Sequence, residues 1–181
     1  MSELEFEPFH RVAEIDRFSC GASDLDKFIQ TEEVEKYHEQ GYGDTTLVWR
    51  DHSVVGYYTV GRGELDAEWL KVGQKSFTTR REFVEDNIPA MKIGRLAVDR
   101  HIQKKGLGRI ILVKIATETM EMTPRPPILV VRANPDSIEF YEKFGFQPVT
   151  KRPKKATSGS MTLFFVLDTL GPNDIRGEVD L

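Results

Sequence analysis

Cysteine is nearly absent from this chain, in which Cys20 is the only one among 181 residues. A single thiol cannot build an internal disulfide framework. Long apolar runs are absent as well, because no stretch approaches the roughly 18 apolar residues of a membrane-spanning helix. The acidic N-terminus also lacks the basic and then apolar layout of a signal peptide. We therefore expect a cytoplasmic protein that has no membrane partner.

The chain has no excess of basic residues. Its 25 Lys and Arg residues and 29 Asp and Glu residues give a net charge of −4 and a pI near 5.6. This balance argues against a protein whose whole surface holds nucleic acid, although it allows a local patch. Two small basic groups are present, and the usual meaning of such a group is a solvated loop. They are Arg80 with Arg81, and Lys151, Arg152, Lys154 and Lys155.

Apolar periodicity predicts alternating strands and helices. Strands are expected at residues 4–10, 45–50, 54–61, 91–99, 128–133 and 161–168. Helices are expected from an N-cap at Ser23 to the glycines at 41 and 43, at 108–122 and at 136–144, with 64–87 helical or irregular. This order predicts an α/β domain of three layers with a mixed sheet. Residues 170–181, which are polar with Gly and Pro, are expected to form a flexible tail.

A glycine-rich stretch follows the strand expected at 91–99. The residues Gln103-Lys-Lys-Gly-Leu-Gly108 open the next helix, and two glycines let backbone N–H groups point inward without a Cβ in the way. Such a turn at a helix N-terminus is a site for an anion such as a pyrophosphate. The glycines do not follow the dinucleotide pattern G-x-G-x-x-G. The alternative is a strand-to-helix connection that binds no ligand.

A second block, Asn134-Pro-Asp-Ser-Ile-Glu-Phe-Tyr-Glu-Lys-Phe-Gly-Phe146, lies about 25 residues after the first. Together the two blocks resemble the signatures of the GNAT N-acetyltransferases. The resemblance covers residues 4–168 and implies a single GNAT domain over 1–169, with a mostly antiparallel sheet flanked by helices. It also implies acetyl-CoA as the cofactor and an amine as the acceptor. GNAT domains often pair, so a homodimer is a further expectation.

The resemblance assigns roles to particular residues. Backbone N–H groups of the loop would hold the diphosphate, the strand before it would pair with the pantetheine amides, and an Asn would hold the pantetheine arm. The implied cofactor-binding residues are Leu96, Ala97, Val98, Gln103, Lys104, Lys105, Gly106, Leu107, Gly108, Arg109 and Asn134. Tyr141 is the implied general acid that protonates the departing thiolate. The alternative is that Tyr141 is a core aromatic among neighbouring Phe residues.

Other residues of reactive type show no clear catalytic or metal-binding pattern. Cys20 has no His at a readable spacing, so a structural cysteine is expected, and the four His residues form no metal pattern. Arg95 is expected either to face the substrate or to form a structural ion pair. No general base is visible, and Glu64, Asp66 or a water chain stay open. Because an α-amino group has a pKa near 8 and a lysine near 10.4, the former is more often neutral and favoured as the acceptor.

The opening Phe18-Ser-Cys-Gly-Ala-Ser-Asp-Leu-Asp-Lys-Phe-Ile29 resembles that of the GNAT toxins of toxin–antitoxin modules. Val55-Gly-Tyr-Tyr-Thr59 and Ile93-Gly-Arg-Leu-Ala-Val-Asp99 fit the same subfamily. This resemblance implies acetylation of the amino acid carried on tRNA and an antitoxin as partner. The acidic net charge and Asn134, where the toxins often have another residue type, depart from that pattern. The first interpretation is therefore an acetyl-CoA-dependent N-acetyltransferase whose amine acceptor is unassigned, and the toxin and a non-catalytic acyl-CoA sensor are the alternatives.

Overall fold

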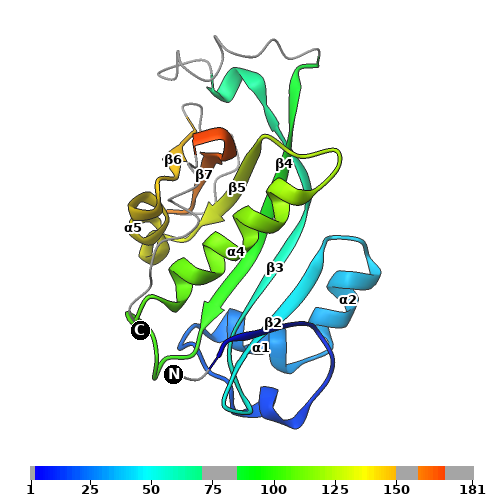
Figure 1. Ribbon diagram of the computed structural model, residues 1–181, viewed down its shortest axis with the longest axis vertical. Coiled ribbons are helices and arrows are strands. Elements are labelled where there is room, and N and C mark those ends of the chain that lie inside the picture. The colour runs from blue at the N-terminus through cyan, green and yellow to red at the C-terminus, as the bar shows by residue number, and fades with distance from the viewer. Residues whose placement is uncertain (1–2, 71–84, 150–158, 170–181) are drawn as a thin grey trace. The chain divides into compact units, whose positions relative to one another are not determined.

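The computed structural model describes residues 3–70, 85–149 and 159–169 of the chain (Figure 1). Seven strands form a sheet in the order β1-β2-β3-β4-β5-β7-β6. The chain divides into two compact units: unit 1 includes Met1–Gly61 and Ile93–Ile115, and unit 2 comprises Arg62–Lys92 and Ala116–Gly177. Strands β3 (Ser53–Asp66) and β4 (Asn87–Val98) and helix α4 (Leu107–Glu121) each continue from one unit into the other. The single domain expected over residues 1–169 stays a prediction.

In unit 1, β1 (Glu5–Pro8) pairs antiparallel with β2 (Asp44–Arg50), and β2 pairs antiparallel with β3. The turn between β2 and β3 holds Asp51 and His52 at φ 50° and 60°. This left-handed conformation at both positions matches the twist that a two-residue hairpin turn needs. The hairpin predicted from the sequence is therefore confirmed.

Two short helices, α1 (Ser23–Gln30) and α2 (Glu33–Glu39), cover one face of the unit 1 sheet, together with the 3-10 helix η1 (Ala13–Arg17). Their apolar side chains meet strand residues in one core cluster. Its buried members are Ile15, Phe18, Phe28, Ile29, Val34, Leu47, Val54, Tyr57 and Ala97. The side chain of Tyr57 is fully buried and its hydroxyl donates to the Leu25 carbonyl at 2.7 Å. The helical pair is thereby fixed to the centre of the sheet.

The one long helix predicted after residue 22 is wrong, because the chain breaks at Thr31, where ψ is 179°. Arg11 stabilises the break. Its guanidinium donates to the carbonyls of Ile29 at 3.2 Å and Thr31 at 2.7 Å and pairs with Glu35 at 2.6 Å. The guanidinium thus satisfies two carbonyls near the end of α1, a contact from a distant segment that helical periodicity cannot reveal.

The predicted N-cap at Ser23 is also wrong. Ala22 holds the cap position without a side-chain hydrogen bond, and Ser23 is the first helical residue. The carboxylate of Asp26 instead reaches back beyond the helix, where it accepts hydrogen bonds from the backbone N–H of Cys20 at 2.7 Å and the hydroxyl of Ser19 at 2.8 Å. The polar residues of the first turn therefore order the preceding turn of the chain.

Helix α4 begins on the opposite face of the unit 1 sheet. A Cβ on Gly56 would lie 3.4 Å from Cδ1 of Ile111 and 2.9 Å from the carbonyl oxygen of Ala97, so glycine lets helix and strands approach closely. Ile111, Leu112 and Ile115 are at most 1% exposed, as the apolar character of this segment predicted. Of the helices described, none combines the length and apolar character needed to cross a membrane.

In unit 2, β5 (Ile128–Ala133) pairs antiparallel with β7 (Met161–Val166), which also pairs with the two-residue strand β6 (Gln147–Pro148). Helix α5 (Pro135–Phe144) packs on β5 and β7. It ends at Gly145, whose φ of 115° only glycine adopts readily. Short 3-10 helices, η2 (Ala67–Leu70) and η3 (Leu167–Thr169), follow β3 and β7. The strands predicted at 128–133 and 161–168 and the helix predicted at 136–144 are confirmed within two residues.

The segment 64–87, expected to be helical or irregular, is partly wrong. Strand β3 continues to Asp66, and β4 already begins at Asn87 rather than at 91. Pro89, which precedes the predicted strand, lies within β4 at an exposed position of an alternating burial pattern. Proline is tolerated in a strand where its missing N–H is not needed by the ladder. The basic groups at 80–81 and 151–155 and the tail at 170–181 lie outside the described residues.

We expect Gly43→Ala to destabilise unit 1 much more than Gly41→Ala does. At Gly43, φ is 152° and a new Cβ would overlap the Val60 carbonyl of the neighbouring strand, so the free energy of unfolding should fall by about 3 kcal/mol. At Gly41, φ is 74° but the space is open, so the cost should be about 1 kcal/mol. Urea denaturation measures both, and equal losses would contradict the packing assigned here.

Candidate functional site

The loop that joins β4 to α4 in unit 1 exposes backbone donors. Lys104 and Gly106 have φ values of 63° and 89°, which turn the chain before α4 begins at Leu107. The backbone N–H groups of Gly106, Leu107 and Gly108 form no hydrogen bond with any residue that the structure describes. The Gly106 carbonyl accepts from Arg109 and Ile110 at 3.0 and 3.2 Å, which starts the helix. Consecutive unpaired N–H groups at a helix N-terminus suit a phosphate group.

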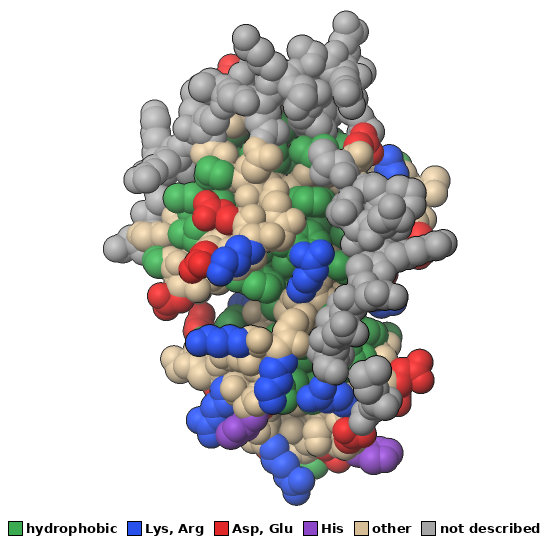
Figure 2. Space-filling view, turned by 60° about the vertical axis from the view of Figure 1, so that its left-hand side comes forward, with side chains coloured by type: hydrophobic (Ala, Val, Ile, Leu, Met, Phe, Trp, Pro, Cys, Tyr) green, Lys and Arg blue, Asp and Glu red, His purple; other side chains and the backbone are tan. Residues whose placement is uncertain are grey.

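Cationic side chains surround these donors. Lys104, Lys105 and Arg109 are exposed, as is Arg100 at the start of the loop. Figure 2 shows that Lys and Arg side chains gather on part of one face of the molecule although the chain is acidic overall. Positive charge beside unpaired N–H groups fits the diphosphate of coenzyme A, so the residues present suit the cofactor that the sequence implied.

Within unit 1, the residue 93–98 half of β4 is the last strand after β1, β2 and β3. Because the N–H of Asp99 donates to the Val55 carbonyl of β3 at 2.9 Å, alternate residues along β4 turn toward β3. The backbone groups of Leu96 and Val98 therefore point away from β3, and those of Ala97 point toward it. Of the three strand residues predicted to meet pantetheine, Leu96 and Val98 thus direct their backbone groups away from β3, and the Val98 carbonyl already accepts a hydrogen bond from Gln103 at 2.9 Å.

Gln103 has a structural contact that the motif did not predict. Its side-chain amide donates to the carbonyls of Val98 at 2.9 Å and Cys20 at 2.8 Å. It therefore links the loop to the end of β4 and to the turn before α1. Partial burial and, to a smaller extent, the Asp26 carboxylate raise the pKa of the Cys20 thiol to about 11, although the hydrogen bond to the Ala22 carbonyl acts in the opposite direction. A thiol with this pKa is protonated at neutral pH, in agreement with the structural role expected for it.

In unit 2, Tyr141 lies on the buried side of α5. It is 5% exposed and its ring meets those of Phe140 and Phe146 edge-on, at centroid distances of 5.0 and 5.3 Å. Burial raises the pKa of its phenol well above the usual value. The hydroxyl forms no hydrogen bond with the residues described, so a protonated donor is retained in an aromatic environment.

Asn134 holds the N-cap position of α5. Its carbonyl accepts from the N–H and the hydroxyl of Ser137 at 2.9 and 3.0 Å, while its side chain makes no capping hydrogen bond. The side-chain amide is exposed and forms no hydrogen bond with the part of the chain that the structure describes, so its donors and acceptor can meet a ligand. Of the two carboxylates kept open as bases, Asp66 accepts from the Glu68 N–H at 2.8 Å and Glu64 is exposed.

Arg95 stacks on two aromatic rings, a contact that the sequence did not predict. Its guanidinium lies 3.7 Å from the ring centroid of Phe28 and 4.9 Å from that of Tyr37. Such stacking is a cation–π contact within the α1–α2 layer. Gly94 is required next to it, because a Cβ there would lie 2.5 Å from the hydroxyl of Tyr37.

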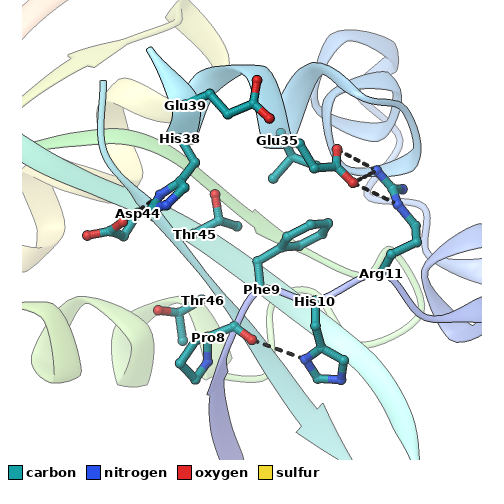
Figure 3. A pocket seen from close by; sticks show the side chains of 11 residues that line it. Pro8, Phe9, His10, Arg11, Glu35, His38, Glu39, Asp44, Thr45 and Thr46 are labelled. Carbon is teal, nitrogen blue, oxygen red and sulfur yellow. Dashed lines mark hydrogen bonds and ion pairs between the residues drawn. The ribbon is translucent and has the colours of Figure 1, made fainter. Parts of the chain in front are cut away.

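A separate pocket of about 720 Å³ lies between α2, β2 and the end of β1 (Figure 3). His38 pairs with Asp44 at 2.8 Å on its rim, and the ion pair of Arg11 with Glu35 closes another side. Thr45 is 6% exposed, and its hydroxyl has no hydrogen-bond partner among the described residues. None of the predicted site residues lines this pocket, and no sequence pattern indicated it.

Comparison with known proteins shows which family and which relatives the chain is similar to. The family model of the acetyltransferase (GNAT) domain matches residues 77–161. A tRNA-acetylating toxin of Mycobacterium tuberculosis is 28% identical over 137 residues, which cover 74% of this chain and 78% of the relative.

Solved structures share the fold. AtaT in complex with acetyl-methionyl-tRNAfMet matches with a TM-score of 0.72 and 24% identity, over 92% of this chain and 96% of that one. A structure described as a bacterial toxin matches with a TM-score of 0.76 and 16% identity, over 93% of each chain. These matches confirm the predicted fold class. Residues 77–161 thus match an acetyltransferase (GNAT) domain, and together these similarities support an N-acetyltransferase that uses acetyl-CoA.

Proposed function

We propose that the acceptor is the α-amino group of an amino acid carried on tRNA, and that an antitoxin controls the enzyme. The observation that carries this proposal is the match to a tRNA-acetylating toxin along about three quarters of both chains. The opening at residues 18–29 supports it, since that segment resembles the opening of the GNAT toxins. Structures of similar fold were solved with acetylated tRNA, and with an antitoxin segment and acetyl-CoA.

The distribution of charge is compatible with a tRNA substrate. Phosphate contacts supply much of the affinity for nucleic acid, and they require only a local concentration of Lys and Arg. Arg100, Lys104, Lys105 and Arg109 are all exposed around one loop. The net charge of −4 therefore limits the area available for tRNA without removing it. The homodimer expected from the family stays a prediction.

The chemistry of the amine favours the same substrate. A lysine side chain with a pKa near 10.4 is almost wholly protonated at pH 7, whereas an α-amino group near 8 is partly neutral. An enzyme without a dedicated base can use the second group more readily. Of the two carboxylates kept open as bases, Asp66 is already engaged in a hydrogen bond from the backbone N–H of Glu68.

For the cofactor, we assign the diphosphate to the N–H groups of Gly106, Leu107 and Gly108, with Lys104, Lys105 and Arg109 supplying charge. The outward backbone of Leu96 and Val98 would pair with the pantetheine amides, and the Leu96 N–H would donate to the thioester oxygen as negative charge develops there. Acetyl-CoA supplies the activated acetyl group. Ala97 would hold β4 in place through its packing in the core, and Gln103 would hold the loop through its hydrogen bonds to Val98 and Cys20. The side-chain amide of Asn134 would bind the pantetheine arm.

Tyr141 is the proposed general acid. As the amine nitrogen forms its bond to the acyl carbon, the carbon–sulfur bond breaks and the sulfur leaves with the electron pair. The phenol O–H then donates its proton to that sulfur. Two observations support this role: the side chain is buried, and its hydroxyl forms no hydrogen bond with the described residues, so its proton is available to the sulfur. Structures of similar fold were also solved as tyrosine-to-phenylalanine mutants of AtaT and KacT.

We expect Tyr141→Phe to lower kcat by about 100-fold while the KM for acetyl-CoA changes little, because the ring stays and only the proton donor is lost. Since burial raises the pKa of Tyr141, the donor stays protonated beyond its ordinary value of about 10. The wild-type kcat should therefore not fall as the pH rises from 8 to 10. Tyr42→Phe, at a ring that is 58% exposed, is the matched control. Near-normal kcat in Tyr141→Phe would remove this residue from the mechanism.

The acceptor is tested with labelled acetyl-CoA and a panel of charged tRNAs. We expect label only on tRNA whose amino acid has a free α-amine, and none on uncharged tRNA or on aminoacyl-tRNA with a blocked amine. Binding should weaken steeply as salt rises, because phosphate contacts carry it. A larger kcat/KM with lysine peptides or small amines would replace this acceptor. Slow hydrolysis of acetyl-CoA with no acceptor in the panel would favour the sensor.

A further inference from the structure

The turn at Ser19 and Cys20 lies between two carboxylates. From α1, Asp26 accepts hydrogen bonds from the Cys20 N–H at 2.7 Å and the Ser19 hydroxyl at 2.8 Å. From the end of β4, Asp99 accepts from the Ser19 N–H at 3.3 Å with one oxygen and from the His101 N–H at 2.9 Å with the other. Both ends of this short turn are thereby fixed.

The same turn holds the cofactor loop through its carbonyl groups. The Ser19 carbonyl accepts from the N–H of Arg100 at 2.9 Å, and the Cys20 carbonyl accepts from the side chain of Gln103 at 2.8 Å. Residues 100 and 103 are the first part of the loop whose later N–H groups stay unpaired. The contacts therefore run from α1 to the loop without a gap: Asp26, the turn, and Gln103.

We infer that Asp26 is a positioning residue for acetyl-CoA, which acts through the Ser19–Cys20 turn and Gln103 to hold the phosphate loop in its binding conformation. This inference rests on the proposed role of that loop. A loop that leaves its own donors unpaired must obtain its order from outside, and this turn provides it. Asp26 is at least 80 residues before the N–H groups it would position, and it lies in the 18–29 segment rather than in the phosphate loop.

The charge state of Asp26 agrees with this role. Partial burial acts to raise its pKa, but hydrogen bonds from Cys20 and Ser19 outweigh burial and hold the pKa below the usual value. The carboxylate is therefore ionised at neutral pH and accepts with both oxygens. Asparagine at this position would offer one acceptor in place of two and turn a donor toward the other group.

The test compares binding of free coenzyme A, measured by calorimetry, in wild type, Asp26→Asn, Gln103→Leu and the double variant. Each single change should weaken binding about tenfold, because the loop donors lose their alignment. The double variant should be no weaker than the worse single variant, since both changes break one chain of contacts. The exchange of the amide protons of Gly106, Leu107 and Gly108 should quicken in each variant. In turnover, KM for acetyl-CoA should rise while kcat at saturation stays within about twofold.

Asp24→Asn is the matched control, because this carboxylate lies in the same turn of α1, is exposed and makes no hydrogen bond or ion pair with the residues described. It should bind coenzyme A as the wild type does. Unchanged affinity in Asp26→Asn, with only a lower melting temperature, would overturn the inference and leave a purely structural role. Additive losses in the double variant would also overturn it. Failure of the wild type to bind coenzyme A would instead refute the proposed function of the loop.

Discussion

The loop from Asp99 to Gly108 must keep several backbone donors unpaired and still hold one conformation. Such donors normally order a chain by bonding to its own carbonyls, and an unpaired group is costly once it is shielded from water. Here Gly106 is exposed and Gly108 is partly exposed, so water or a ligand can reach their N–H groups, and order comes from other atoms. The side chains of Asp99 and Gln103 and the carbonyls of residues 19 and 20 supply it. The anion site is therefore a property of contacts distant in sequence.

The strand before the loop is held from both sides. On one face, Gly56 lets Ile111 of α4 approach the strands, and on the other Ala97 packs into the cluster beneath α1 and α2. Neither face leaves room for a shift of β4 by one residue, since such a shift would move Ala97 to the opposite face. The direction of the Leu96 and Val98 backbone groups is consequently fixed by packing. The site is built on a rigid strand, with the loop as its adjustable part.

Periodicity predicted the elements whose order depends on their own sequence. The hairpin around residue 52, the buried helix α4 and strand β5 each repeat a pattern of apolar residues that suits one structure. The failures have distant causes. The break between α1 and α2 depends on Arg11, which comes from a segment about 20 residues earlier. Asp26 resembled a residue of a helical first turn, yet its partners precede the helix. Motifs located the loop, but contacts of this kind are invisible until the chain is folded.

The burial of Tyr141 has a cost for its proposed role as general acid, because a phenol with a raised pKa is a weaker acid. The relevant quantity is the difference between the proton affinities of donor and acceptor in the same surroundings. An apolar environment disfavours a thiolate as well as a phenolate, so the proton affinity of the departing sulfur rises with that of the phenol. The unfavourable gap of roughly 1.5 pKa units between a thiol and a phenol in water is thus largely retained rather than enlarged. Burial adds a benefit, since it keeps the O–H protonated throughout the range in which an α-amine is neutral.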